Sequence, residues 1–117
     1  QIVFINSSVG TTARAGVGQY AATTHAWKAI ADSLREEVNP DGVRVLSIFV
    51  GRTASPMQAA VHATERRPYH PETLLQPEDV ALVVLHALGL PRTAEVADIS
   101  VRPLSKLNPN SNSQEGT

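Results

Sequence analysis

The chain has 117 residues, a net charge of −1 and no cysteine, and 42% of its residues are hydrophobic. These totals fit one globular domain and exclude a disulfide framework, and the absence of a basic stripe argues against a dedicated nucleic-acid binder. No apolar run approaches the ~20 residues that a bilayer span needs, so we expect no membrane partner. A chain without cysteine fits a reducing compartment, and we expect a cytoplasmic protein.

The first predicted element is a buried strand over residues 1–6. It holds the run Ile2-Val3-Phe4-Ile5, which is apolar and rich in β-branched residues. Residues 7–17 form a loop of small residues in which Arg14 carries the only charge. Because the chain starts at Gln1, in a strand-like run and without an initiator methionine, we expect a fragment of a longer protein or a processed one.

A long helix is predicted over residues 18–38. Apolar side chains recur at helical spacing and define one face, while charged side chains mark the solvent side. The helix stops at the turn signal Asn39-Pro40-Asp41-Gly42. The apolar face holds Trp27, Ile30, Ala31, Leu34 and Val38, and the solvent side holds Asp32, Arg35, Glu36 and Glu37.

The next predicted strand covers residues 43–50. It is nearly all apolar after Arg44, as expected for a strand that is covered on both faces of a parallel sheet. Residues 52–75 contain several prolines, and we expect irregular structure there with a short helix near 57–64.

Another helix begins at Gln76-Pro77-Glu78-Asp79, where proline and two acids suit the positive end of a helix. It runs to Leu88 and is stopped by Gly89, and an alternating strand follows over residues 94–101. The alternation of strands with long helical crossovers predicts an α/β fold with three parallel strands. Residues 106–117 have nothing to bury and are expected to form a flexible polar tail.

Ser7 and Tyr20 form the most informative pair of side chains. Ser7 closes the first strand, and Tyr20 follows thirteen positions later in the first turn of the long helix. A hydroxyl and a phenol placed in this way can converge on one substrate oxygen. The arrangement resembles the short-chain dehydrogenase/reductase family, in which the serine polarises the substrate carbonyl and the tyrosine is the general acid or base. The resemblance assigns these catalytic roles to Ser7 and Tyr20, with Ser8 as the adjacent alternative.

The resemblance extends from Gln1 to about Leu104 and covers the C-terminal half of the family's domain. It implies that residues 1–105 are part of a Rossmann-type, doubly wound parallel sheet that binds NAD or NADP. The glycine-rich turn that cradles the cofactor pyrophosphate is absent from this sequence. We therefore expect that turn in a missing N-terminal half, and we expect no useful dinucleotide binding by the isolated chain.

A cofactor segment follows the second strand in the family. Here Gly51 is kept, Thr53 falls at the position that contacts the nicotinamide carboxamide, and Ser55 replaces the threonine near the pyrophosphate. Val50 stands where the family has proline. The resemblance makes Gly51, Thr53 and Ser55 cofactor-binding residues, together with Tyr20 and Thr24 on the helix.

Thr24 departs from the family, which has lysine one helical turn after the tyrosine. An ammonium ~5 Å from the phenol supplies roughly 3 kcal/mol at an effective dielectric of ~20, so its loss lowers the phenolate population about a hundredfold. Thr24 carries no charge, although its hydroxyl can bond to a ribose hydroxyl. His25 or Lys28 could compensate, but Lys28 starts ~6 Å too far along the axis.

Two hypotheses follow from these residues. In the first, the chain is part of an NAD(P)-dependent oxidoreductase that acts on a small carbonyl or alcohol, and Thr24 weakens its activity. The alternative is a noncatalytic relative that keeps the fold for cofactor sensing or subunit assembly. In this family the helix over 18–38 often pairs across a dimer, so we expect a homo-oligomer and a packing or interface role for Trp27.

The remaining candidates suggest simpler roles. Three histidines show no metal-ligand spacing, and we expect no metal site. The pair Arg66-Arg67 is expected to be solvated, or to guard the substrate mouth, because residues 55–75 match the family's variable substrate loop. The histidines are His62, His70 and His86.

Overall fold

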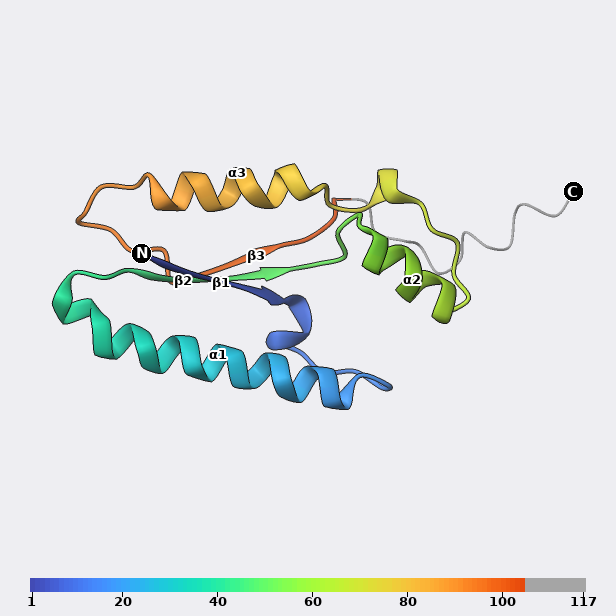
Figure 1. The fold of residues 1–117 in the computed structure, drawn as a ribbon, viewed down its shortest axis with the longest axis horizontal. Helices are drawn as coiled ribbons and strands as arrows, with labels where there is room; N and C mark the ends of the chain where they lie inside the picture. The colour runs from blue at the N-terminus through green and yellow to red at the C-terminus, as the bar shows by residue number, and fades with distance from the viewer. Residues whose placement is uncertain (105–117) are drawn as a thin grey trace, which may run out of the picture.

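The computed structural model describes residues 1–104 and shows a parallel sheet between two helical layers (Figure 1). One helix, α1, covers one face of the sheet, and another helix, α3, covers the opposite face. This arrangement confirms the predicted α/β fold. The bounds are β1 Ile2–Ser7, α1 Gly18–Val38, β2 Val45–Val50, α2 Pro56–Thr64, α3 Pro77–Leu88 and β3 Asp98–Val101.

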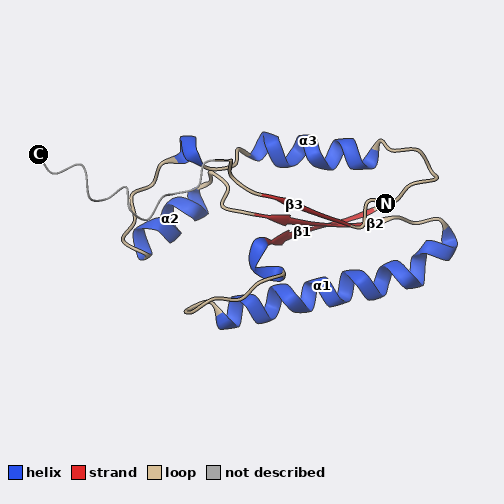
Figure 2. Ribbon diagram, turned by 180° about the vertical axis from the view of Figure 1, so that it is seen from behind, coloured by secondary structure: helices blue, strands red, loops and turns tan. Residues whose placement is uncertain are grey.

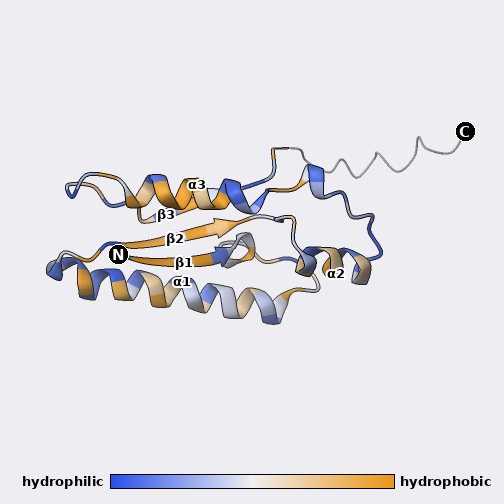
Figure 3. Cartoon of the chain, turned by 45° about the horizontal axis from the view of Figure 1, so that its top comes forward, coloured by the Kyte–Doolittle hydropathy of each residue, from blue (hydrophilic) through white to orange (hydrophobic). Residues whose placement is uncertain are grey.

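The sheet has the order β1-β2-β3, and all its pairings are parallel. Ser7 pairs with Val50, and Val50 pairs with Val101, so the carboxyl ends of the strands meet at one edge. The central strand β2 is buried from Val45 to Phe49, as its continuous apolar run predicted, and Figure 3 shows the hydrophobic strands between the helices. The tail expected over 106–117 lies outside the described residues.

The third strand is shorter than the predicted range of 94–101. It begins at Asp98, because the carboxylate of Glu95 occupies the position that an earlier ladder bond would need. The Oε2 atom of Glu95 accepts from the backbone nitrogen of Val45 at 2.9 Å, and regular pairing starts only at Ser47 with Asp98. At the start of the pairing between β2 and β3, the Val45 N–H therefore donates to a side-chain carboxylate and not to a backbone carbonyl.

The face of α1 that meets the sheet differs from the predicted apolar face. Trp27 and Ile30 are 52% and 54% exposed, whereas Ala21, Thr24 and Ala31 are buried. Trp27 and Ile30 of the predicted apolar face are therefore not buried against the sheet, because small side chains let the helix lie close to it. Trp27 still packs on β1, with its ring centroid 5.5 Å from that of Phe4.

Arg35 was predicted on the solvent side of α1, and that prediction was wrong. Only 11% of its side chain is exposed. Its guanidinium donates to the carbonyls of Val45 and Ala97, each at 3.0 Å, and pairs with Asp32 at 2.9 Å. The aliphatic stem covers apolar surface while the charged end reaches strand carbonyls, which a polarity pattern does not reveal.

The segment between β2 and α3 lies beyond the carboxyl ends of the strands (Figure 2). It contains α2 and a short 3-10 helix, Pro71–Thr73, which agrees with the predicted short helix near 57–64. None of the helices in the described part of the chain is long and apolar enough to cross a bilayer.

Helix α2 ends in a Schellman motif with arginine where glycine is usual. Arg66 N donates to Ala63 O at 3.1 Å, and Arg67 N donates to His62 O at 2.9 Å. Arg66 has φ of 56°, in the left-handed region that glycine occupies without steric cost. Arg66 and Arg67 are both exposed, as expected for solvated residues.

Arg44 anchors the end of α3 to the start of β2. Its guanidinium is buried and donates to the carbonyls of Leu88, Leu90, Pro91 and Ala94, at 2.9 to 3.2 Å. Carbonyls at a helix C-terminus lack partners within the helix, and a buried one needs a donor from elsewhere. Arg44 supplies these donors through a rigid fork.

We predict that Arg44→Met lowers the free energy of unfolding by about 3 kcal/mol, because it takes the donor away from four partly buried hydrogen bonds. Urea unfolding followed by circular dichroism measures the effect. The control is Arg92→Met, which removes an exposed arginine that donates to Gly42 O. Equal shifts of the two midpoints would show that Arg44 has no special role.

We predict that Arg66→Gly raises the free energy of unfolding by up to about 1 kcal/mol, because glycine relieves the left-handed conformation. The matched control is Arg67→Gly, whose backbone has negative φ and which therefore loses stability through added chain entropy. Thermal unfolding of both variants tests the difference in sign, and a loss of stability in Arg66→Gly contradicts this account.

Candidate active site

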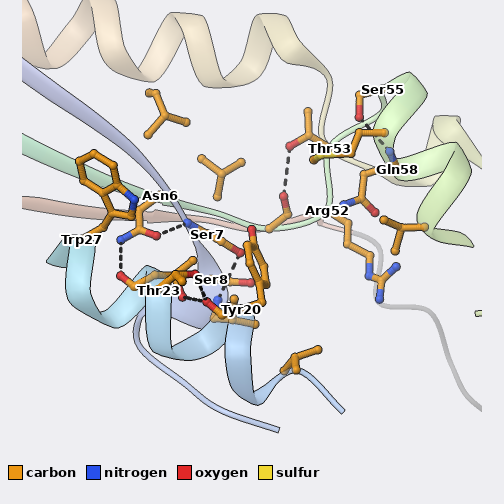
Figure 4. A pocket seen from close by; sticks show the side chains of 18 of the residues that line it. Asn6, Ser7, Ser8, Tyr20, Thr23, Trp27, Arg52, Thr53, Ser55 and Gln58 are labelled. Atoms are coloured by element: carbon orange, nitrogen blue, oxygen red, sulfur yellow. Dashed lines mark hydrogen bonds between the residues drawn. The ribbon is translucent and has the colours of Figure 1, made fainter. Parts of the chain in front are cut away.

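A pocket of about 680 Å³ lies at the carboxyl ends of β1 and β2, beside the first turns of α1 and α2 (Figure 4). Parallel strands bring these ends to one edge, so residues far apart in the sequence meet there. The wall includes Ser8, the alternative to Ser7. It also includes every residue predicted for the site: Ser7, Tyr20, Thr24, Gly51, Thr53 and Ser55.

Ser7 is the last residue of β1, one position beyond the predicted boundary, and its hydroxyl is placed to donate. Its Oγ atom accepts from Val9 N at 3.4 Å, at the start of the 3-10 helix Ser8–Gly10. A hydroxyl that accepts in this way keeps its proton for another partner. Ser7 can therefore donate to a ligand oxygen in the pocket.

Asn6 fixes Ser7 relative to α1. Its Oδ1 accepts from Ser7 N at 2.7 Å, and its Nδ2 donates to the backbone carbonyl of Thr24 at 3.0 Å. Gly10 makes room for this amide, because a Cβ at that position would lie 2.9 Å from Nδ2. The sequence reasoning missed Asn6, although a polar residue directly before the serine was a usable signal.

Tyr20 lies in the first turn of α1 and is 52% exposed. Its side chain and that of Ser7 both point into the pocket, from the helix and from the strand end (Figure 4). No hydrogen bond to the Tyr20 hydroxyl is present among residues 1–104. The two oxygen groups thus share one cavity on one side of the sheet, and both can reach a ligand.

Thr24 is buried between the helix and the end of β1, with 6% of the residue exposed. Its hydroxyl lies 3.0 Å from the carbonyls of both Tyr20 and Ala21. The single proton of the hydroxyl goes to one of these carbonyls, and the oxygen lone pairs remain free. Thr24 can therefore accept a hydrogen bond from a pocket ligand, but it brings no positive charge.

The two candidates for replacing the lysine charge point elsewhere. Lys28 Nζ lies 2.6 Å from Asp32 and 3.7 Å from Asp98, and the hydrogen bond to Asp32 raises the pKa of Lys28. His25 Nδ1 lies 2.6 Å from the carbonyl of Ala21. Neither Lys28 nor His25 is part of the pocket wall.

The turn between β2 and α2 forms the opposite wall. A Cβ at Gly51 would lie 2.9 Å from Cδ of Pro103, so the close approach of these segments requires glycine. Thr53 Oγ1 donates to Gly51 O at 3.1 Å. Ser55 Oγ accepts from Gln58 N at 3.1 Å and caps α2, which leaves the Ser55 proton available to a ligand.

The segment from Tyr69 to Leu75 holds this turn in place. Tyr69 Oη accepts from Ser55 N at 3.1 Å and lies 3.3 Å from Ser55 O, to which it donates. Leu75 N donates to Arg52 O at 3.1 Å, and Ala54 N donates to Leu75 O at 2.8 Å. The backbone that carries Thr53 and Ser55 is therefore bonded to a distant part of the chain, a role for Tyr69 that the sequence did not signal.

The histidines occupy structural or surface positions. His62 is 1% exposed, with Nδ1 2.7 Å from Gln58 O and its ring edge-on to Tyr69 at 5.4 Å. His70 lies 3.3 Å from Glu72 at the surface. Across residues 1–104, no three His, Cys, Asp or Glu side chains gather as metal ligands do.

The sheet order, the two helical layers and a pocket at the carboxyl ends define part of a Rossmann-type dinucleotide-binding domain. A sequence model described as short chain dehydrogenase matches residues 1–66. An uncharacterized oxidoreductase of Staphylococcus aureus (strain USA300) is 36% identical over 85 residues, which cover 73% of this chain and 34% of that protein. The chain belongs to the short chain dehydrogenase family, and it spans about a third of the length of that curated relative.

Solved structures agree with this assignment. A short chain dehydrogenase from Mycobacterium paratuberculosis, bound to NAD, is 26% identical with a TM-score of 0.65, over 85% of this chain and 42% of that one. Serine dehydrogenase from Escherichia coli has a TM-score of 0.69 at 24% identity, over 91% of this chain and 41% of that one. The second comparison shows the shared fold alone.

We predict that Tyr69→Phe lowers the free energy of unfolding by about 1–2 kcal/mol, because the Ser55 N–H loses its acceptor while the ring packing on His62 is retained. Urea unfolding measures the loss. Tyr69→Leu, which also removes the ring, should cost more. A Tyr69→Phe variant as stable as the wild type would mean that water replaces the phenol at this turn.

Proposed function

We propose that this chain forms the catalytic half of an NAD(P)-dependent oxidoreductase that interconverts a small carbonyl compound and its alcohol. The observation that carries the proposal is the shared pocket of Ser7 and Tyr20 at the carboxyl edge of the sheet. Because the chain spans about a third of the curated relative, we assign the pyrophosphate turn to a separate N-terminal half. Residues 1–105 are then the C-terminal portion of one domain.

The proposed chemistry uses a donor and a proton carrier. The Ser7 hydroxyl donates to the substrate oxygen and stabilises the negative charge that develops on it during reduction. The Tyr20 phenol delivers a proton to the same oxygen, or removes it in the direction of oxidation. A bound nicotinamide would supply or accept the hydride.

The pocket residues fit the nicotinamide end of such a cofactor. Thr53 and Ser55 lie on one wall and Tyr20 with Thr24 on the other, so a flat ring can be held between them. Ser55 has a free hydroxyl proton at the start of α2, where helix amides favour phosphate oxygens. The NAD bound to the Mycobacterium paratuberculosis relative supports the same class of cofactor.

Thr24 makes the proposed activity weak. Proton transfer near neutral pH is faster when a cation stabilises the phenolate form of the tyrosine, and Thr24 does not provide one. Lys28 is engaged with Asp32 and Asp98, which supports the view that Lys28 does not replace the missing charge. The same observation favours the second candidate function, a noncatalytic protein that binds cofactor for sensing or for subunit assembly.

The exposed apolar surface suggests where partners bind. Ile5 on the free edge of β1 is 62% exposed, and Ile2 is 36% exposed. Unpaired strand edges of this kind are normally covered, so we assign the edge to a strand of the N-terminal half. Trp27 and Ile30 on α1 are about half exposed and offer a surface for a second copy.

We predict that Thr24→Lys in the intact protein raises the rate of NAD(P)H-dependent turnover, by up to about a hundredfold. The control is Ala22→Lys, which adds the same charge to an exposed position outside the pocket. Steady-state assays across a panel of small aldehydes, ketones and alcohols measure the change. A Thr24→Lys variant with no gain over the wild type and the control counts against a weakened oxidoreductase.

Cofactor binding and turnover should be measured separately on the same wild-type sample. Calorimetric titration with NADH and NADPH reports binding without chemistry. Binding together with slow turnover supports the oxidoreductase, while binding without detectable turnover supports the noncatalytic relative. If neither cofactor binds to the intact protein, both proposals are wrong.

A further inference from the structure

Arg52 stands in the pocket wall at a position that the proposed proton transfer does not use. It follows Gly51 at the carboxyl end of β2 and lines the same cavity as Ser7 and Tyr20. The backbone around it is fixed, because Arg52 O accepts from Leu75 N at 3.1 Å. The backbone that carries this side chain is therefore held at the pocket wall.

One end of this guanidinium is paired and the other is not. Nη2 donates to Glu65 Oε1 at 2.8 Å, and 20% of the Arg52 side chain is exposed. Nη1 is buried and has no hydrogen-bond partner within the described residues, and the same holds for Oε1 of Gln58, which also lines the pocket. A buried donor without an acceptor is costly, so a small shift of the Arg52 side chain that brings Nη1 to a ligand oxygen is favourable.

The net charge of the pocket wall also favours an anionic ligand. The ionisable side chains of its wall, apart from Tyr20, are Arg14, Arg52 and Glu65, which leaves one positive charge in excess. The hydrogen bond from Arg52 holds the pKa of Glu65 below its ordinary value, so Glu65 stays ionised and keeps Arg52 oriented. An arginine oriented in this way binds carboxylates and other oxyanions well.

We propose that Arg52 selects a substrate that carries a carboxylate in addition to its reacting carbonyl or hydroxyl group. The carboxylate accepts from Nη1, while Ser7 and Tyr20 act on the reacting oxygen. Arg52 determines specificity, and Glu65 positions it from the C-terminal end of α2. This inference rests on the proposed oxidoreductase pocket and adds to it the chemical class of the substrate.

The test measures binding, so it does not depend on the residual activity. Calorimetric titrations of the intact protein use 3-hydroxybutyrate and its methyl ester, each with and without NADPH. The acid should bind at least tenfold more tightly than the ester, and Arg52→Gln should remove that preference while changing the ester affinity less than twofold. Equal binding of acid and ester to the wild type, or no binding of either, overturns the proposal.

Arg67 offers a matched control. It lies 3.8 Å from the same Glu65 carboxylate, but it is 60% exposed and outside the pocket wall. Arg67→Gln removes the same charge and should leave the acid preference within twofold of the wild type. If Arg67→Gln and Arg52→Gln lower acid binding equally, the preference comes from the general electrostatic field, and the role of Arg52 is refuted.

Glu65→Gln provides a second variant in case Arg52→Gln fails to fold. It keeps the Arg52 charge and an amide oxygen that can still accept from Nη2, and it removes the competing anion, so acid affinity should rise at least threefold while ester affinity stays constant. A fall in acid affinity contradicts the proposal. NADPH affinity separates the other source of an oxyanion: if Arg52→Gln weakens NADPH and leaves 3-hydroxybutyrate unchanged, Arg52 serves a cofactor phosphate and the substrate proposal fails.

These outcomes also separate this inference from the proposed function. If the wild-type protein does not bind NADPH, the oxidoreductase proposal is refuted, but the acid titration without cofactor still tests the role of Arg52. If the wild type binds NADPH but does not prefer the acid to the ester, the oxidoreductase proposal stands and the carboxylate substrate class is refuted.

Discussion

The amide of Asn6 is the contact on which the geometry of the pocket depends. It accepts from Ser7 N and donates to the Thr24 carbonyl, so it joins the end of β1 to the second turn of α1. Packing of Trp27 on Phe4 also joins these two elements, but the Asn6 bridge is the polar contact that lies next to the serine. Because both hydrogen bonds are partly buried and come from one planar amide, the bridge fixes distance and orientation together.

A second set of polar contacts joins the two helical layers to the sheet, away from the pocket. Arg35 reaches the carbonyls of β2 and of the residue before β3, and Arg44 reaches the end of α3. Two arginines thus connect the helices on opposite faces to the same sheet. Both arginines bond to backbone atoms, so they depend on the path of the chain more than on the identity of neighbouring side chains.

Much of the fold follows from sequence patterns. The continuous apolar run of β2 and the helix start at Gln76 were strong signals, because such a run is typical of a strand covered on both faces and proline followed by acids is typical of a first helical turn. The rotation of α1 was not predictable from polarity, since Arg35 is buried by its stem and Trp27 stays half exposed. The residues that line the pocket together were expected from the resemblance to the short-chain dehydrogenase/reductase family. Asn6 and Tyr69 act through hydrogen bonds to backbone atoms, which no periodic sequence pattern reveals.

The Asn6 bridge has a consequence for how this pocket can change over generations. It bonds to the carbonyl of residue 24 and not to that residue's side chain, so the bond itself does not require any particular side chain at position 24. A lineage can exchange a cation for a neutral hydroxyl there, or reverse the exchange, and still keep the hydrogen bond that joins strand end to helix. The charge at position 24 and this one anchor of the serine are therefore inherited separately.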